Sequence, residues 1–276
     1  MDFENVLTLI QKELRDAFRN RWFLLYAIAF AGLSLALAWF SVSGAGSYGV
    51  AGFGRTTAGL INLILLIVPL MGLTLGALSL AGEREKGTLI YLLAQPISSG
   101  ELLLGKFVGL ALALTAALLI GFGLTGVMMV VAGGGGDFGI FATLMVLSVL
   151  LAIVSLRLGI LISAAVKKAA TAVGLALFLW LILVYFGDLG LMGTAVVMKL
   201  KAWQLLALAL INPLQVFKIA AVFDLRNNLE VLGPAGIYAF RTYGTTLWPL
   251  LVGLLLTWVI VPFALATQVF RKRGVI

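Results

Sequence analysis

The sequence contains no cysteine and no histidine. Disulfide bonds, thiolate chemistry and imidazole ligation of metals are therefore excluded, and we expect neither a metal site nor a cofactor. Charged side chains are also scarce: they make up 11% of the 276 residues, against about 25% in ordinary soluble domains. This composition argues against a soluble domain and predicts an integral membrane protein.

Long apolar runs dominate what is present. A hydrocarbon core of about 30 Å needs roughly 20 helical residues, and the lack of water in lipid forces each spanning run to be helical. We therefore predict one all-α membrane domain with six transmembrane helices. The predicted spans cover residues 23–42, 58–81, 105–132, 140–166, 169–186 and 247–270.

The N-terminal residues 3–22 form an amphipathic pattern. Apolar side chains recur at nearly helical spacing from Phe3 to Trp22, while the other face carries charged residues: Lys12, Arg15, Asp16 and Arg19. This pattern predicts a helix that lies in the membrane interface beside anionic headgroups.

A charged stretch separates the second and third spans, and we call residues 83–104 the elbow. Gly87 can supply a left-handed cap after the apolar helix, and Thr88 can begin a short helix that Pro96 stops. Ser98 and Glu101 form a capping-box pattern that opens the next long helix. The elbow is therefore predicted to contain one short helix between two turns.

The short helix carries an apolar set: Leu89, Ile90, Leu92 and Leu93. We expect these side chains to be exposed unless lipid headgroups or a groove on another protein cover them. We favour docking to a partner protein.

Two further features concern helix packing. Gly72 and Gly76 have the spacing that lets helices approach closely, either within the chain or between subunits. In residues 187–246, the run 202–211 is too short to cross the membrane and a break follows at Asn212 and Pro213. We predict short helices that dip into the membrane from the far side.

Arg157 lies inside the fourth span, where a charge costs several kcal/mol unless it reaches the interface or finds a partner. Two interpretations are open. The side chain either extends toward Lys167 or pairs with Glu83 or Glu85.

The cations give the orientation. The net charge of +8 comes from 19 Lys and Arg, most of which flank one end of the predicted spans. The positive-inside bias predicts that both termini and the elbow are cytoplasmic and that residues 187–246 are outside. Because the cations mark topology, we expect no nucleic-acid partner.

One motif has to be rejected. Gly100, Gly105 and Lys106 have the spacing of a phosphate-binding loop, but Phe107 replaces the required Ser or Thr and no strand precedes the loop. Any ATPase must therefore be another chain.

The elbow also resembles a known family. Its residues Glu83, Arg84, Glu85, Gly87, Thr88, Leu92, Leu93, Ala94, Pro96, Ser98, Glu101, Gly105 and Lys106 are similar to the signature of exporter-type ABC transporter permeases. In that family the elbow is a coupling helix that sits in a cleft of a cytoplasmic ATPase. The segments that begin at Arg157 and Ile211 resemble a narrower group, the permeases of nitrous-oxide reductase maturation systems.

The resemblance implies a permease subunit in the bacterial inner membrane rather than an enzyme. It implies a homodimer in the lipid bilayer, two ATPase chains and a periplasmic β-helical accessory protein that serves the copper-sulfur sites of the reductase. The residues it assigns to ATPase coupling are Glu83, Arg84, Glu85, Lys86, Leu89, Leu92, Leu93, Pro96 and Glu101.

The expected function is export, or mechanical signalling to the periplasmic partner. Without Cys or His, copper could be held only by Met or oxygen groups, so a sulfur species or no cargo fits better than free copper. The alternatives are an exporter permease for an unrelated substrate, or a stand-alone carrier or channel. A carrier needs ionisable groups on a pathway, and within the spans only Arg157 qualifies.

Overall fold

The computed structural model describes residues 3–43, 49–94, 97–131, 138–190, 200–226 and 233–273. Six helices in these ranges are long and apolar enough to cross a membrane, as predicted. The helices are α1 (Phe3–Arg19), α2 (Arg21–Ser43), α3 (Gly49–Glu85), α4 (Thr88–Leu93), α5 (Ser99–Val131), α6 (Phe138–Ala165), α7 (Ala169–Leu181), the π-helical η1 (Ile182–Gly190), α9 (Ala202–Ile211), α10 (Pro213–Arg226), α11 (Gly233–Tyr243), a 3-10 turn (Gly244–Thr246) and α12 (Leu247–Arg273).

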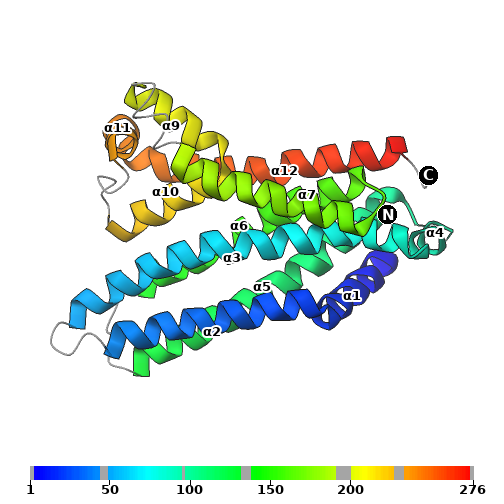
Figure 1. Cartoon of the computed structure of the whole chain (residues 1–276), viewed down its shortest axis with the longest axis horizontal. Helices are drawn as coiled ribbons and strands as arrows, with labels where there is room; N and C mark the ends of the chain where they lie inside the picture. Colours follow the sequence, from blue (N-terminus) through cyan, green and yellow to red (C-terminus); the bar gives the residue numbers. More distant parts are fainter. Residues whose placement is uncertain are drawn as a thin grey trace.

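The long helices run side by side along the molecule (Figure 1). Helices α1 and α4 and both chain termini lie at one end, which we call the elbow end, while α9 and α11 lie at the other. A chain that crosses the membrane an even number of times has both termini on the same side, and the arrangement of this chain agrees with six crossings.

The centre of the bundle is the contact between α3 and α6. A Cβ atom on Gly76 would lie 2.5 Å from the backbone oxygen of Leu156, and one on Gly72 would lie 2.8 Å from that of Ala152. Nearby, the buried Ser163 hydroxyl donates to the Ala77 carbonyl at 2.6 Å and accepts from two amides of α3. The small-residue spacing in the second span therefore serves packing within the chain.

The N-terminal stretch differs from the single helix that was predicted. It breaks at Asn20, whose side-chain oxygen accepts a hydrogen bond from the Trp22 amide at 3.0 Å and so caps α2. Helix α1 then packs on α5, where Cβ atoms on Gly105 and Gly109 would lie 2.7 Å from the Cβ atoms of Leu9 and Glu13. The buried face of α1 consists of Val6, Leu9, Glu13 and Ala17. It therefore includes a charged residue, Glu13, whereas the sequence predicted a purely apolar face.

The predicted break at Asn212 is present. Helices α9 and α10 meet there at a bend of 114°. The Asn212 side chain accepts from the Leu214 amide at 2.9 Å and donates to the Leu183 carbonyl in η1 at 2.6 Å. Helix α10 is more deeply buried than a helix dipping into lipid would be: Phe217 and Ala220 are fully covered, and α10 contacts α3, α6 and α12.

The close α3–α6 contact gives a first prediction. Gly76→Ala should destabilise the fold by about 1–3 kcal/mol, because its new methyl group meets the backbone of α6 rather than a movable side chain. Gly174→Ala is the matched control, since a Cβ atom at Gly174 has no neighbour within 4 Å. Thermal unfolding of both variants in detergent checks this, and equal midpoints would contradict the tight contact.

Candidate functional site

The elbow has the predicted turn chemistry. Gly87 adopts a left-handed conformation with φ of 73°, which ends the run from α3 before α4 begins at Thr88. At the other end, the Ser98 amide donates to the Glu101 carboxylate at 2.9 Å, and the Glu101 amide donates to the Ser98 hydroxyl at 3.2 Å. This reciprocal capping box starts α5. Pro96 lies outside the described residues.

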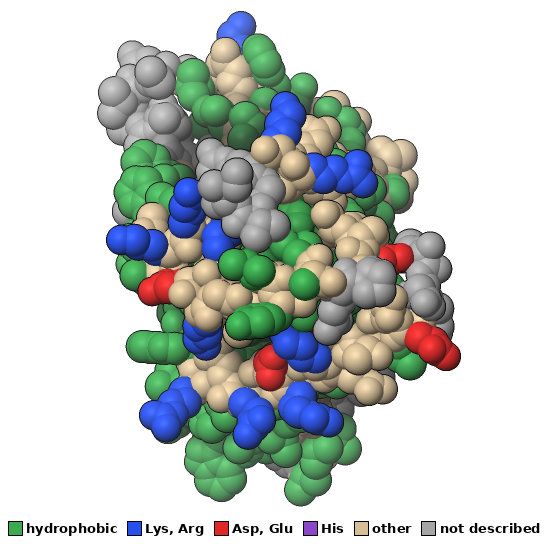
Figure 2. Space-filling view, turned by 90° about the vertical axis from the view of Figure 1, so that its right-hand side faces the viewer, with side chains coloured by type: hydrophobic (Ala, Val, Ile, Leu, Met, Phe, Trp, Pro, Cys, Tyr) green, Lys and Arg blue, Asp and Glu red, His purple; other side chains and the backbone are tan. Residues whose placement is uncertain are grey.

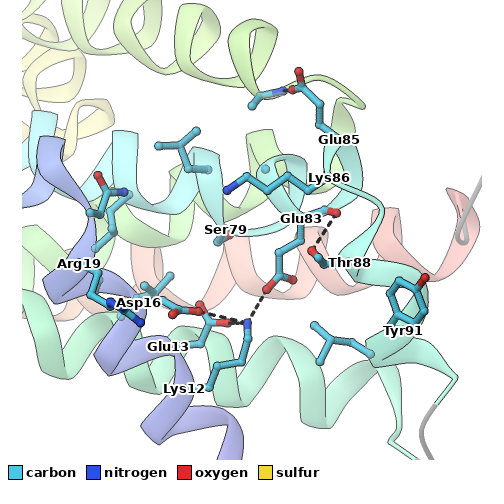
Figure 3. Close-up of a pocket in the computed structure, with 18 residues that line it drawn as sticks. Lys12, Glu13, Asp16, Arg19, Ser79, Glu83, Glu85, Lys86, Thr88 and Tyr91 are labelled. Atoms are coloured by element: carbon cyan, nitrogen blue, oxygen red, sulfur yellow. Dashed lines mark hydrogen bonds and ion pairs between the residues drawn. The ribbon is translucent and has the colours of Figure 1, made fainter.

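A network of four charged residues joins α3 to α1 and α5 at the elbow end. Lys106 on α5 donates to Glu13 of α1 at 2.6 Å and lies 2.8 Å from a carboxylate oxygen of Glu83 at the end of α3. Lys12 on α1 contacts the same two carboxylates, at 3.0 Å for Glu13 and 2.6 Å for Glu83 (Figure 3). We call Lys12, Glu13, Glu83 and Lys106 the ion network.

Burial makes the ion network a strong constraint. The side chains of Lys106 and Glu13 are 1% and 6% exposed, so each charge depends on the other for its stability. Although burial opposes the charge on Lys12, the carboxylates of Glu13 and Glu83 raise its pKa above the usual value. Lys12 therefore stays positively charged throughout the physiological pH range.

The next two residues of the elbow bind the connection between α6 and α7. The Arg84 guanidinium donates to the Val166 carbonyl at 2.5 Å, just beyond the end of α6. The Glu85 carboxylate accepts from the Ala169 amide at 2.6 Å, at the first residue of α7. A cation at a helix C-terminus and an anion at a helix N-terminus are both favoured by the helix dipole. These residues thus hold the elbow to α6 and α7.

The apolar side chains of α4 divide into two groups, which corrects the expectation that all are exposed. Leu89 is 1% exposed, and Leu92 and Leu93 pack partly buried against the core. Ile90 and Tyr91 are 59% and 77% exposed. The short helix therefore attaches to the bundle with one side and presents Ile90 and Tyr91 outward.

An open groove of about 900 Å³ lies between α1 and the elbow. Its walls include Lys12, Asp16, Glu83 and Thr88, and Figure 3 shows Lys12, Glu13 and Glu83 of the ion network lining it. Lys86 lines the groove with an exposed side chain. Cations gather across this end of the molecule (Figure 2).

Arg157 pairs with neither Glu83 nor Glu85, which corrects the second interpretation made from the sequence. Its guanidinium carbon lies 3.1 Å from the centroid of the Phe107 ring and 3.7 Å from that of Phe263. No ion pair between Arg157 and Glu83 or Glu85 is present, because Glu83 pairs with the lysines of the network and Glu85 binds α7. Two aromatic rings, from α5 and α12, therefore compensate the buried charge.

Several site residues escaped the sequence reasoning. Lys106 was taken as a topology signal and as part of a rejected motif, whereas it is the centre of the ion network. Glu13 was not singled out, although it sits at helical spacing with the buried Leu9 and Ala17. The glycine pair at Gly105 and Gly109 was the available signal, because glycines four residues apart predict close approach of another helix.

Comparison with known protein families identifies the class of protein to which this chain belongs. The family model for ABC-2 family transporter proteins matches residues 7–275. The chain belongs to the ABC-2 family of transporter permeases. The family implies ATPase subunits as partners, and the chain itself is a permease subunit.

Two relatives match over nearly the whole length. The protein named "Probable ABC transporter permease protein NosY" of Stutzerimonas stutzeri is 33% identical over 275 residues, which cover 97% of this chain and 98% of the relative. The protein of the same name from Pseudomonas aeruginosa is 33% identical over 280 residues, which cover 98% and 99%. The chain is thus a NosY-like membrane permease.

The ion network gives a second prediction. Lys106→Met should destabilise the permease by about 3–5 kcal/mol, because it leaves two carboxylates close together with only Lys12 to neutralise them. Adding Glu13→Gln should restore part of the loss, since the pair is removed together. Unfolding in mixed detergent measures both, with the exposed Lys86→Met as control. Additive effects of the two substitutions would contradict the coupling.

Proposed function

We propose that this permease couples ATP hydrolysis by a separate ATPase chain to work on the opposite side of the membrane, and that α4 is its coupling helix. The observation that carries the proposal is the construction of the elbow. Glu83 binds α1 and α5, and Arg84 and Glu85 bind the α6–α7 connection. Ile90 and Tyr91 face outward. A push on α4 would therefore be passed to α1 and α5 and to the α6–α7 connection together.

The proposed orientation puts the elbow end in the cytoplasm. The exposed cations of this end come from α1, α2, the elbow, the α6–α7 connection and α12: Arg15, Arg19, Arg21, Lys86, Lys167, Lys168, Arg271 and Lys272. An excess of Lys and Arg beside the ends of membrane helices supports a cytoplasmic position. Both termini lie at the same end (Figure 1).

The proposed system is that of nitrous-oxide reductase maturation. The likeness to the two NosY proteins supports this assignment, together with the sequence resemblance to permeases of that system. We propose that two copies of the chain form a homodimer with two ATPase chains and a periplasmic β-helical protein. This complex would act in the inner membrane.

The proposed cargo is a sulfur species, or none, rather than free copper. Among the described residues, no group of three or more carboxylates is arranged to hold a metal ion. Met71 and Met129 are 1% and 6% exposed within the apolar core, and Met128 and Met145 pack against it. These four methionines therefore serve packing, so the described residues contain no thioether path for copper.

The exposed side of α4 gives a third prediction. Ile90→Asp combined with Tyr91→Asp should prevent co-purification with the ATPase, because it places two charges where an apolar surface would be buried at about 25 cal/mol per Å². Leu92 and Leu93 are unsuitable for this test, since they pack on the permease itself.

Tyr91→Phe is the matched control, because it keeps the ring and should keep the complex. Size-exclusion profiles verify that each variant is folded. If the double Asp variant retains the ATPase and its hydrolysis rate, α4 is not the docking helix.

The link to α7 gives a fourth prediction. Glu85→Ala removes the acceptor of the Ala169 amide, so it should leave the ATPase bound but lower reductase maturation in cells. Glu85→Gln keeps an acceptor oxygen and should be much less affected. Loss of the complex in the Ala variant would instead assign Glu85 to docking, and normal maturation would show that the link transmits nothing.

A further inference from the structure

The open groove between α1 and the elbow is charged at one end and apolar at the other. The charged side chains belong to α1 and to the elbow, whereas Leu75 and Leu78 of α3 and Leu110 of α5 line the apolar part. Leu75 lies ten residues before Glu85, the last residue of α3, which is about 15 Å at 1.5 Å per helical residue. The groove therefore extends from the charged elbow end into the apolar part of the bundle.

Two of the cations on this groove have no anionic partner. Three cations line it: Lys12, Arg19 and Lys86. Lys12 belongs to the ion network. Arg19 at the end of α1 and Lys86 at the elbow are exposed, and neither forms an ion pair with any described residue. Figure 3 shows both among the residues that line the groove.

The carboxylates of the groove are already engaged within the chain. Two of them belong to the ion network. Asp16 lies 3.5 Å from Lys12, and Glu85 accepts a hydrogen bond from the Ala169 amide at 2.6 Å. The charges that remain for a ligand are therefore positive.

The groove also has room for a ligand. Its volume of about 900 Å³ is near the upper end of the range for small-molecule sites, about 300–1,000 Å³. Gly82 on α3 forms part of the wall, and a Cβ atom on Gly82 would have no neighbour within 4 Å. The space beside Gly82 is thus not filled by the described part of the chain.

We propose that the groove binds an anionic phospholipid. Its phosphate group would be held by Arg19 and Lys86, and one acyl chain would lie beside Leu75 and Leu78. A phospholipid is present at the membrane interface and is anionic at one end and apolar at the other, as this groove requires. Basic pockets between membrane helices bind anionic headgroups in the same way. The site does not depend on the docking of α4.

The test uses the purified, delipidated full-length permease in detergent and follows its thermal midpoint. The probes are phosphatidylglycerol, an uncharged galactolipid with the same acyl chains, and sodium phosphate. We expect only phosphatidylglycerol to raise the midpoint. Arg19→Gln combined with Lys86→Gln should weaken the apparent affinity about thirtyfold, because each cation beside an anionic headgroup contributes roughly a factor of five.

Arg271→Gln combined with Lys272→Gln is the matched control. It also removes two exposed cations, but neither of them lines the groove, so its response to phosphatidylglycerol should equal that of the wild type. An equal loss of affinity in both double variants would mean that the lipid senses only the net charge, and this would overturn the proposal.

A second variant tests the space rather than the charge. Gly82→Trp keeps every cation and fills the groove, so it should also abolish the response to phosphatidylglycerol. Gly253→Trp is its control, because a Cβ atom on Gly253 of α12 has no neighbour within 4 Å and lies outside the groove. The midpoints without lipid verify that each variant is folded.

The remaining outcomes are distinct. Equal stabilisation by the galactolipid, or a response to sodium phosphate alone, overturns the assignment to an anionic lipid. A wild type that phosphatidylglycerol does not stabilise also overturns it and leaves the groove to a segment of a partner protein. An unchanged affinity in the Arg19 and Lys86 double variant overturns the proposal whether or not Gly82→Trp folds.

Discussion

The pairing of buried Lys106 with Glu13 and Glu83 is the interaction on which the elbow end depends. An ammonium group that is 1% exposed is tolerated only with anionic partners, and these partners come from α1 and α3. Three helices must therefore meet at one point. Gly105 and Gly109 make the meeting possible, because any larger side chain there would hold α1 away from α5.

The bundle contains two tightly packed pairs of helices, which meet where α5 packs on α6 and which the elbow also connects. Backbone contact around Gly76 and the hydrogen bonds of Ser163 hold α3 to α6, while glycines hold α1 to α5. Charged contacts, which are longer-ranged and more tolerant of displacement than backbone packing, connect the pairs to the elbow. This division suits a permease in which rigid units shift relative to one another.

The sequence predicted those parts of the structure that depend on local signals. Hydropathy located the six spans, Gly87 located the turn, and Ser98 with Glu101 located the start of α5. What it missed depends on contacts between distant segments: periodicity shows that a helix has a buried face but not which helix covers it. The partners of Lys106 and the rings around Arg157 come from other helices, so no local pattern could reveal them. Leu89 and Ile90 are equally apolar, and only the position of α4 on the bundle separates them.

The burial of α10 has a consequence for biogenesis. Phe217 and Ala220 are covered by helices that lie both earlier and later in the chain, because α10 contacts α3, α6 and α12. Helix α10 therefore cannot reach its final environment until α12, which follows it in the chain, has been synthesised and has entered the membrane. The core around α10 is completed only after α12 has been made, and until then the nascent permease exposes the apolar face of α10 to lipid or to an insertion factor.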